Sequence, residues 1–461
     1  MGIPSDEVVI IRPPESPGGP SLITVSCPDK TGLGCDLCRV ILLFGLSIVR
    51  GGTLLPSFTP IKTPISRLPP CCFSFALGEK LKLESLLDFS TDGRWCYVLL
   101  WVAERGRKET RWDLLKKRLV AVCPSVSPPL VSEINSSDQE MDAEQKPQVF
   151  LLKFSCYDRM GLLHDLSDDY EMADVTEVLC ELELTIRRVK VSTTPDGTVM
   201  DLFLITDTRE LLHTQSRRED ACNRLRAILG DSMCSCEIEL ASEEIASCLQ
   251  ASSSLPPSIT EDMLTLEIQD ESSNAVPQSS FLSVSVDNSL SHAHSLIQIQ
   301  CYDHKGLLYD IMRTLKDYNM QVSYGRFNTK ENGNCNVDLL VVQNDGKKIV
   351  DPNKQVALCS RLRMELSSPL RVTLVSRGPD IELLVANPVE ICGKGRPLVF
   401  YDITYALKLL EIRIFLAEIG RHVIGDREWE VYRVHLGDDH ELCASKDKIV
   451  DGVTKMLMGW H

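Results

Sequence analysis

A decapeptide that occurs twice constrains the fold of this chain more than any other feature. Residues 156–165 read CYDRMGLLHD and residues 301–310 read CYDHKGLLYD, so seven of the ten positions are identical. A weaker third copy, CPDKTGLGCD, occupies residues 27–36. An alternating apolar stretch precedes each copy, and apolar positions at helical spacing follow it. This pattern predicts a strand, a tight turn and a helix at each place.

The sequence after the copy at 301–310 completes a longer repeating unit. Two strand-like stretches fall within residues 320–342, and Asn332-Gly333 between them is a strong hairpin signal. A helical pattern follows at 353–366, and an apolar strand pattern follows at 370–376. The predicted order is βαββαβ, which is an α+β fold of the ferredoxin-like kind.

The distance from the loop glycine to the hairpin glycine identifies the other units. It is 27 residues in the clearest copy, 36 in the second and 61 in the first, between Gly306 and Gly333, Gly161 and Gly197, and Gly32 and Gly93. The excess of nine is assigned to residues 166–174. The larger, proline-rich excess lies at about 53–87, and we expect it in the hairpin between the second and third strands. Two readings of these insertions stay open: surface insertions, which cost little entropy, or an unusual gene model.

The same spacing predicts four repeats along the chain. A faint fourth copy has Leu398 where the others have the loop glycine. The expected repeats occupy residues 20–123, 149–240, 295–376 and 380–461, after an N-terminal tail at 1–19 and around linkers at 124–148 and 241–294. The second linker is rich in Ser, Glu and Asp, so we expect it to be disordered.

Composition excludes several classes of protein. The net charge of −16 argues against nucleic-acid binding, and no run of about 18 apolar residues predicts a membrane span. Without a secretory signal, the 18 cysteines are expected to be reduced, which indicates a cytoplasmic or nuclear location. Neither Cys35-x-x-Cys38 nor Cys234-x-Cys236 has a matching second pair, so we expect no metal and no other cofactor.

No catalytic set is recognisable in the sequence. Cys156, His164 and Asp165 lie close together, but nucleophilic or acid–base catalysis needs a further orienting group. Tyr309 also replaces the histidine in the parallel copy, which suits a packing or ligand-rim role better than proton transfer. We therefore expect no enzymatic activity.

The repeated loop has the chemistry of a small anion site. Its aspartate can turn the chain, and its glycine lets a ligand come close to the backbone. The exposed N–H groups of the first helical turn favour a carboxylate, and the aspartate could accept the ammonium group of the same amino acid. The alternative is a tight strand-to-helix connection that binds nothing.

Four such repeats, with the segments DRMGLLHD, TTPDGTVMDLF and DTRELLH, resemble the plant ACT domain repeat proteins. The resemblance implies a non-catalytic regulatory protein that binds free amino acids. It implies ligand-binding roles for Asp29, Thr31 and Gly32, for Asp158, Gly161, Leu162 and His164, and for Asp303, Gly306, Leu307 and Tyr309. The fourth repeat departs, with Gly395 for the aspartate and Leu398 for the glycine, so we expect a structural role there. The alternative function is a protein–protein interaction scaffold, with a protein partner or a second copy bound through ACT pairing.

Overall fold

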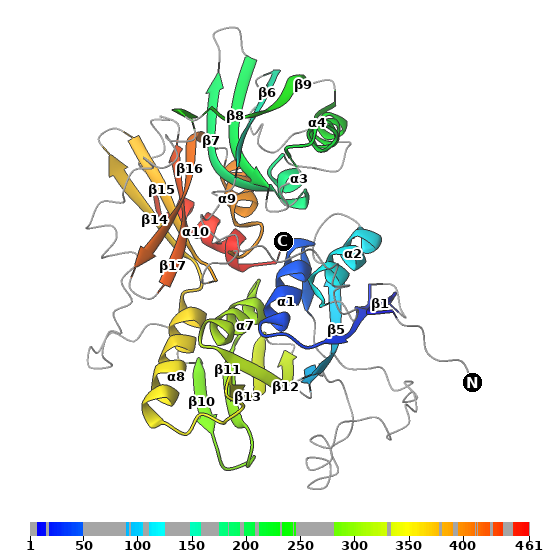
Figure 1. Cartoon of the computed structure of the whole chain (residues 1–461). Coiled ribbons are helices and arrows are strands. Elements are labelled where there is room, and N and C mark those ends of the chain that lie inside the picture. The colour runs from blue at the N-terminus through cyan, green and yellow to red at the C-terminus, as the bar shows by residue number, and fades with distance from the viewer. Residues whose placement is uncertain are drawn as a thin grey trace, which may run out of the picture. The chain divides into compact units, whose positions relative to one another are not determined.

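The structure is a computed structural model of the chain, shown in Figure 1. It describes residues 7–14, 18–48, 89–91, 94–104, 110–124, 148–157, 175–182, 184–193, 198–207, 212–230, 233–242, 244–245, 281–329, 333–377, 380–390, 395–410, 412, 414–424, 427–436 and 446–460. Both predicted insertions, at 53–87 and 166–174, lie outside these residues. The chain divides into two compact bodies, one of residues 1–131, 270–369 and 460–461, the other of residues 132–269 and 370–459.

The first body is built on one antiparallel sheet from the first and third repeats. Its strands run in the order β1-β2-β5-β4-β12-β13-β11-β10, with β3 also paired to β5. Their bounds are β1 Val9–Arg12, β2 Ser21–Pro28, β3 Leu46–Ile48, β4 Phe89–Thr91, β5 Trp95–Glu104, β10 Ser283–Asp287, β11 Ser295–Tyr302, β12 Met320–Thr329 and β13 Asn334–Gln343. The repeats join where β4 pairs with β12.

The described residues of the first body also form four helices, namely α1 Leu33–Leu43, α2 Trp112–Val122, α7 Leu307–Asp317 and α8 Pro352–Ser367. Helix α7 forms because apolar residues recur at helical spacing after Gly306, and it buries Leu308, Ile311 and Leu315. Strand β13 buries every second residue, from Cys335 to Val341. Residues of both repeats belong to one hydrophobic core. The two repeats therefore stabilise one another.

The second body repeats this plan with the second and fourth repeats. Its sheet runs β14-β15-β17-β16-β7-β8-β6-β9. The strands are β6 Val149–Tyr157, β7 Leu184–Thr193, β8 Thr198–Asp207, β9 Met233–Leu240, β14 Arg371–Arg377, β15 Asp380–Pro388, β16 Ile414–Ile424 and β17 Arg427–Leu436. The helices are α3 Val175–Glu181, α4 Gln215–Leu229, α9 Val399–Leu409 and α10 Lys446–Met458. The repeats meet at β16 and β7, where Arg188 and Glu418 form an ion pair of 2.5 Å.

The α+β fold class with βαββαβ-like sets of elements is confirmed, whereas the number of four separate repeats stays a prediction. Apart from β14, which pairs with β15, the described strands of repeats that follow one another in sequence are not partners in the sheets. The first pairs with the third and the second pairs with the fourth. None of the helices in the described part of the chain is long and apolar enough to cross a membrane.

Strand partnership differs from the expectation at three places. The tail at 1–19 contains β1, and the linker at 241–294 contains β10, so neither is wholly unstructured. Strand β14, expected to close the third repeat, pairs with β15 instead. The reason is that β1, β10 and β14 each form a hairpin with the strand that follows them and so occupy the place beside it. In the second repeat, by contrast, the strand after the second helix, β9, pairs beside the first strand, β6.

The break in the first repeat falls inside its second strand rather than in the hairpin that follows. Ile48 of β3 pairs with Val102, and Phe89 of β4 pairs with Val98 of the same strand, β5. In the third repeat a single continuous strand, β12, has this position beside β13. Segments β3 and β4 are thus two ends of one interrupted strand.

Candidate ligand-binding site

Three strand-to-helix loops share one backbone conformation. The residue before the helix lies in the left-handed region, with φ and ψ of 79° and 5° at Gly32, 86° and 5° at Gly306, and 63° and 8° at Leu398. This conformation costs an L-residue roughly 1–2 kcal/mol, which explains the glycine of the repeated decapeptide. In the fourth repeat the fold holds a leucine there. The predicted tight turn is therefore kept whether or not the loop binds a ligand.

The aspartate three residues before the glycine ties each loop to the neighbouring hairpin through its backbone. The N–H of Asp29 donates to the carbonyl of Arg94 at 2.9 Å, and the N–H of Asp303 donates to the carbonyl of Gly333 at 2.8 Å. Helices α1 and α7 then begin at the next residue after each glycine. The loop backbone is thus fixed from both sides, and the first N–H of each helix donates back into its loop, from Leu33 to Lys30 and from Leu307 to His304.

The loop of the first repeat is covered by side chains of the third. A Cβ at Gly32 would lie 2.6 Å from Cδ and Cε of Lys316, at the end of α7. The ammonium group of Lys316 lies 3.5 Å from Asp36, and Gln321 donates a hydrogen bond of 2.8 Å to Asp29. Side chains of the third repeat therefore cover this loop.

The loop of the third repeat faces a cavity instead. The cavity has a volume of about 30 Å³, which admits about two water molecules. The third repeat contributes Asp303, His304, Gly306, Leu307, Leu308 and Tyr309. The opposite wall consists of Cys38, Ile41, Leu42, Leu46, Ser47 and Ile48 of the first repeat, together with Trp460. It is a polar loop opposite a mainly apolar wall.

Two substitutions account for the difference between the two loops. Ten residues after the loop glycine the third repeat has Lys316 and the first has Leu42. Fifteen residues after the glycine the third repeat has Gln321 and the first has Ser47. The long polar side chains close the loop of the first repeat, whereas the shorter ones leave space beside that of the third.

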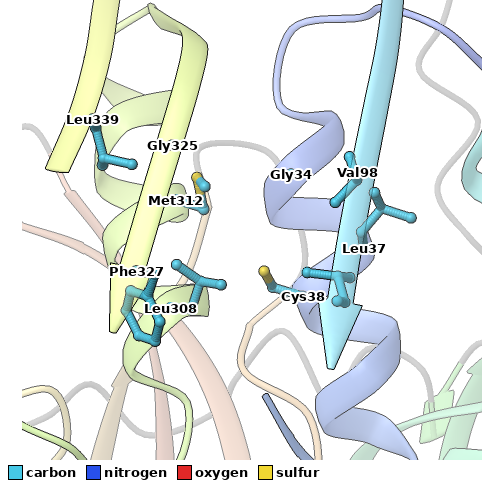
Figure 2. A pocket seen from close by; sticks show the side chains of 10 residues that line it. Gly34, Leu37, Cys38, Val98, Leu308, Met312, Gly325, Phe327 and Leu339 are labelled. Carbon is cyan, nitrogen blue, oxygen red and sulfur yellow. The ribbon is translucent and has the colours of Figure 1, made fainter. Parts of the chain in front are cut away.

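A second cavity in this body is a packing defect rather than a site. Figure 2 shows it between α1 and α7, where Leu37 and Cys38 face Leu308 and Met312. It encloses about 10 Å³ and is lined by apolar side chains and glycines. A volume of this size without polar partners does not hold ordered water.

The structure brings together some of the predicted site residues. Asp303, Gly306, Leu307 and Tyr309 line one cavity, while Leu307 and Tyr309 are also core residues, only 2% and 1% exposed. Asp29, Thr31 and Gly32 form the covered loop of the first repeat. Asp158, Gly161, Leu162 and His164 lie outside the described residues. Ligand binding by any of these residues stays a prediction.

The sequence analysis missed the residues that the partner repeat contributes, and it also missed Trp460. Lys316, Gln321, Leu42, Ser47 and Trp460 lie outside the repeated decapeptide. Comparison of the first repeat with the third at equal distances from the glycine would have found the first four. Their role at the site becomes visible only once the pairing of the first and third repeats is known.

The loop of the fourth repeat is filled by its own polar residues. Glu430 accepts hydrogen bonds from the hydroxyl of Tyr432 at 2.6 Å and from Nδ2 of Asn387 at 3.3 Å. A Cβ at Gly395 would lie 2.7 Å from Nδ2 of Asn387 and 2.9 Å from Oε2 of Glu430. This close packing favours the structural role expected for the fourth loop.

Among the described residues, no group of three or more His, Cys, Asp or Glu side chains could hold a metal ion. Burial raises the pKa of Asp201 on β8 to about 8. That side chain is fully buried and does not line the cavity described above.

Comparison with known proteins gives matches over most of the chain. Family models match an ACR9-like, ACT-like domain over residues 283–380, the C-terminal domain of ACT domain-containing protein ACR9 over 381–459, and the N-terminal domain of ACT domain-containing protein ACR10 over 11–55 and 84–124. Among solved structures, an aspartate kinase from Synechocystis is 10% identical with a TM-score of 0.25, over 68% of this chain and 55% of the kinase. That likeness is too low to interpret.

Two curated relatives from Arabidopsis thaliana match along their whole length. The ACT domain-containing protein ACR10 is 51% identical over 462 residues, and the ACT domain-containing protein ACR9 is 46% identical over 468 residues. Each alignment covers 100% of this chain and 100% of the relative. This chain therefore belongs to the plant ACT domain repeat family.

Proposed function

We propose that this protein is a non-catalytic regulatory protein that binds a free amino acid at the loop Asp303–Gly306, against the wall supplied by the first repeat. The family supports the class of ligand, because ACT domains generally bind amino acids. The observation that carries the choice of loop is the difference between the paired repeats. Lys316 and Gln321 cover the loop at Gly32, while a cavity remains beside Gly306.

The groups around the cavity suit the two charged ends of an amino acid. The N–H groups at the start of α7 can donate to a carboxylate, with support from the helix dipole. The carboxylate of Asp303 can accept from the ammonium group. The amino-acid side chain would then lie against Ile41, Leu42 and Leu46, which are apolar. We therefore expect an aliphatic amino acid to bind better than a charged one.

The cavity must widen to admit such a ligand. A volume of about 30 Å³ admits water but no amino acid. Trp460 is partly buried and packs against this core from the last residues of the chain. Most residues of the wall opposite the loop are buried in the core, whereas Trp460 is only partly buried, so it is the side chain that we expect to move. Ligand binding should therefore change the fluorescence of this tryptophan.

The test is calorimetry of the full-length protein with each of the twenty amino acids, followed by two matched variants. Gly306→Val places a branched Cβ at the site and should abolish binding. Gly346→Val is the control, because Gly346 has a similar φ of 75° and open space around its Cβ position. Both variants carry the left-handed penalty, so only a difference in binding reports on the site. If Gly306→Val and Gly346→Val lose binding equally, the ligand does not bind at the loop of the third repeat.

The second candidate function is an interaction scaffold, and the small volume of the cavity favours it. Strand β9 is an edge of its sheet and is mostly exposed, so it could pair with a strand of a protein partner or a second copy. If folded full-length protein binds no amino acid at millimolar concentration, the scaffold replaces the sensor. The cytoplasmic or nuclear location stays part of this proposal under either function.

A further inference from the structure

The outward face of β5, in the sheet of the first body, carries exposed aromatic side chains. Burial alternates along this strand, and Cys96, Val98 and Leu100 belong to the core. The residues between them point to the opposite face of the sheet. Two of these residues, Trp95 and Tyr97, are 43% and 45% exposed. A single exposed large side chain is common, but two aromatic rings at successive outward positions form a patch.

The fourth repeat has a tryptophan at the same place in its sheet. Trp429 of β17 pairs with Pro388, as Trp95 of β5 pairs with Pro28. The residue after each proline donates its N–H to the carbonyl before each tryptophan, at 3.1 Å in the fourth repeat and 2.9 Å in the first. The two tryptophans are therefore equivalent positions of the repeat.

The ring of Trp429 is covered by two guanidinium groups of its own body. The Cζ atoms of Arg371 and Arg427 lie 5.1 Å and 4.3 Å from the centroid of the ring. At these distances each cation is attracted by the electron-rich face of the indole. Trp429 is only 1% exposed. The fourth repeat thus shows which chemical group fits against a tryptophan at this place.

The first repeat has uncharged residues at the positions of these two arginines. Arg427 lies two residues before its tryptophan, and the residue two before Trp95 is Gly93. Arg371 pairs with the residue two before the proline of its repeat. Val8 has the matching place in the first repeat, because its carbonyl accepts from the N–H two residues before the proline there. Neither Val8 nor Gly93 brings a cation to the ring, and a large part of the ring stays exposed.

We propose that Trp95 and Tyr97 form a docking surface for an extended, arginine-containing segment of a protein partner, whose guanidinium groups stack on the two rings. Alternate residues of an extended segment point to one side and lie roughly 7 Å apart, which is also the spacing of Trp95 and Tyr97 along their strand. Two arginines separated by one residue therefore fit the two rings. The guanidinium group is planar and weakly hydrated, so it stacks better than the ammonium group of lysine.

The charge of the chain favours such a partner over a second copy of this protein. The net charge is −16, with 65 acidic residues against 49 basic ones. A basic segment is therefore attracted to the chain, whereas a second copy is repelled. This inference does not depend on amino-acid binding, since neither ring lines the cavity beside Gly306.

The experiment measures how a fluorescein-labelled peptide of alternating arginine and glycine binds to the full-length protein, by fluorescence anisotropy. The arginine peptide should bind more tightly than its lysine counterpart, and the citrulline peptide, which is planar but uncharged, should bind weakest. Trp95→Ala should weaken binding of the arginine peptide by roughly fivefold. Trp95→Phe, which keeps a ring, should weaken it less. Tyr302→Ala is the control, because this exposed tyrosine belongs to the third repeat and should leave binding unchanged.

A further variant tests the comparison with the fourth repeat in the opposite direction. Val8→Arg supplies a guanidinium group at the position that matches Arg371, so it should cover Trp95 and weaken peptide binding while the circular dichroism spectrum stays unchanged. Equal affinity for the arginine and citrulline peptides, unchanged affinity in Trp95→Ala, or no binding of the arginine peptide at millimolar concentration would overturn the proposal. Sedimentation of the full-length protein tests the other occupant. A dimer that Trp95→Ala dissociates would assign this face to a second copy instead.

Discussion

Asp201 should make the stability of the second repeat fall as the pH rises. Its side chain lies in the core and is 0% exposed, and neither carboxylate oxygen has a hydrogen-bond partner among the described residues. Its partner on the neighbouring strand β6 is Phe154, which lies two residues before the repeated Cys-Tyr-Asp segment. The corresponding positions of the first and third repeats are Val98 and Val337, which face Val25 and Ile299. A valine is therefore known to fit this place in the fold.

The sign and size of the effect follow from the pKa of the carboxyl group. Burial raises the pKa of Asp201 to about 8 in the folded protein, while an unfolded Asp has a pKa of about 3.9. Between these values the folded state keeps a proton that the unfolded state has released, so the free energy of unfolding falls by up to about 1.4 kcal/mol per pH unit. The penalty is about 1.5 kcal/mol at pH 5 and about 4 kcal/mol at pH 7. It is largest above pH 8.

Asp201→Val should remove this penalty and bury two additional methyl groups. We expect a higher free energy of unfolding at pH 7, by about 3–5 kcal/mol, and a smaller gain at pH 5. Urea unfolding at pH 5, 6, 7 and 8 measures both. Asp201→Asn is the control for shape, since it keeps an unpaired buried polar group but cannot ionise. If unchanged protein and both variants show the same dependence on pH, Asp201 is not protonated in the fold, and the reasoning fails.

Two further predictions concern the third repeat. The guanidinium of Arg313 is 1% exposed and lies 2.7 Å from the carboxylate of Glu365. Glu365→Ala would leave this buried charge without its closest partner. It should therefore lower the free energy of unfolding, measured in urea, by about 3–5 kcal/mol. The exposed ion pair of Glu239 with Lys153 is the comparison, and Glu239→Ala should cost under about 1 kcal/mol. Gly306→Ala should cost roughly 1–2 kcal/mol in thermal unfolding because its φ is 86°. An equal cost for the two glutamates, or no cost at Gly306, would contradict these estimates.

The local elements of the repeats could be predicted from the sequence, because each carries its own signal. The repeated decapeptide marks a strand, a left-handed turn and a helix, and α7 begins directly after Gly306 as expected. The partners of the strands could not be predicted in the same way. The sequence LRVTLVS at 370–376 is a clear strand pattern, but its period of two does not say which neighbour it joins. Only two residues separate β14 from β15, so the nearest partner is the following strand.

The walls of the candidate site were hidden for a related reason. Gly306 and Ser47 lie on either side of one cavity but are far apart in the chain. Nothing in the sequence shows that the first repeat meets the third rather than the second. The loop itself was visible because its glycine needs an unusual φ, which is a local property. Leu398 shows the limit of this signal, since the same turn forms there without a glycine.

Pairing of two unequal repeats gives this chain a property that a pair of identical ACT domains cannot have. In a symmetric pair the two loops would face identical walls, and both would be open or both closed. Here Lys316 stands opposite the loop of the first repeat, whereas Leu42 has the matching place opposite the loop of the third. One loop can therefore be sealed by protein side chains while the other keeps its cavity. If the first body senses an amino acid, the expected stoichiometry is one ligand for this pair of repeats. Replacement of Lys316 by the leucine of the matching position would be the direct way to open the second loop.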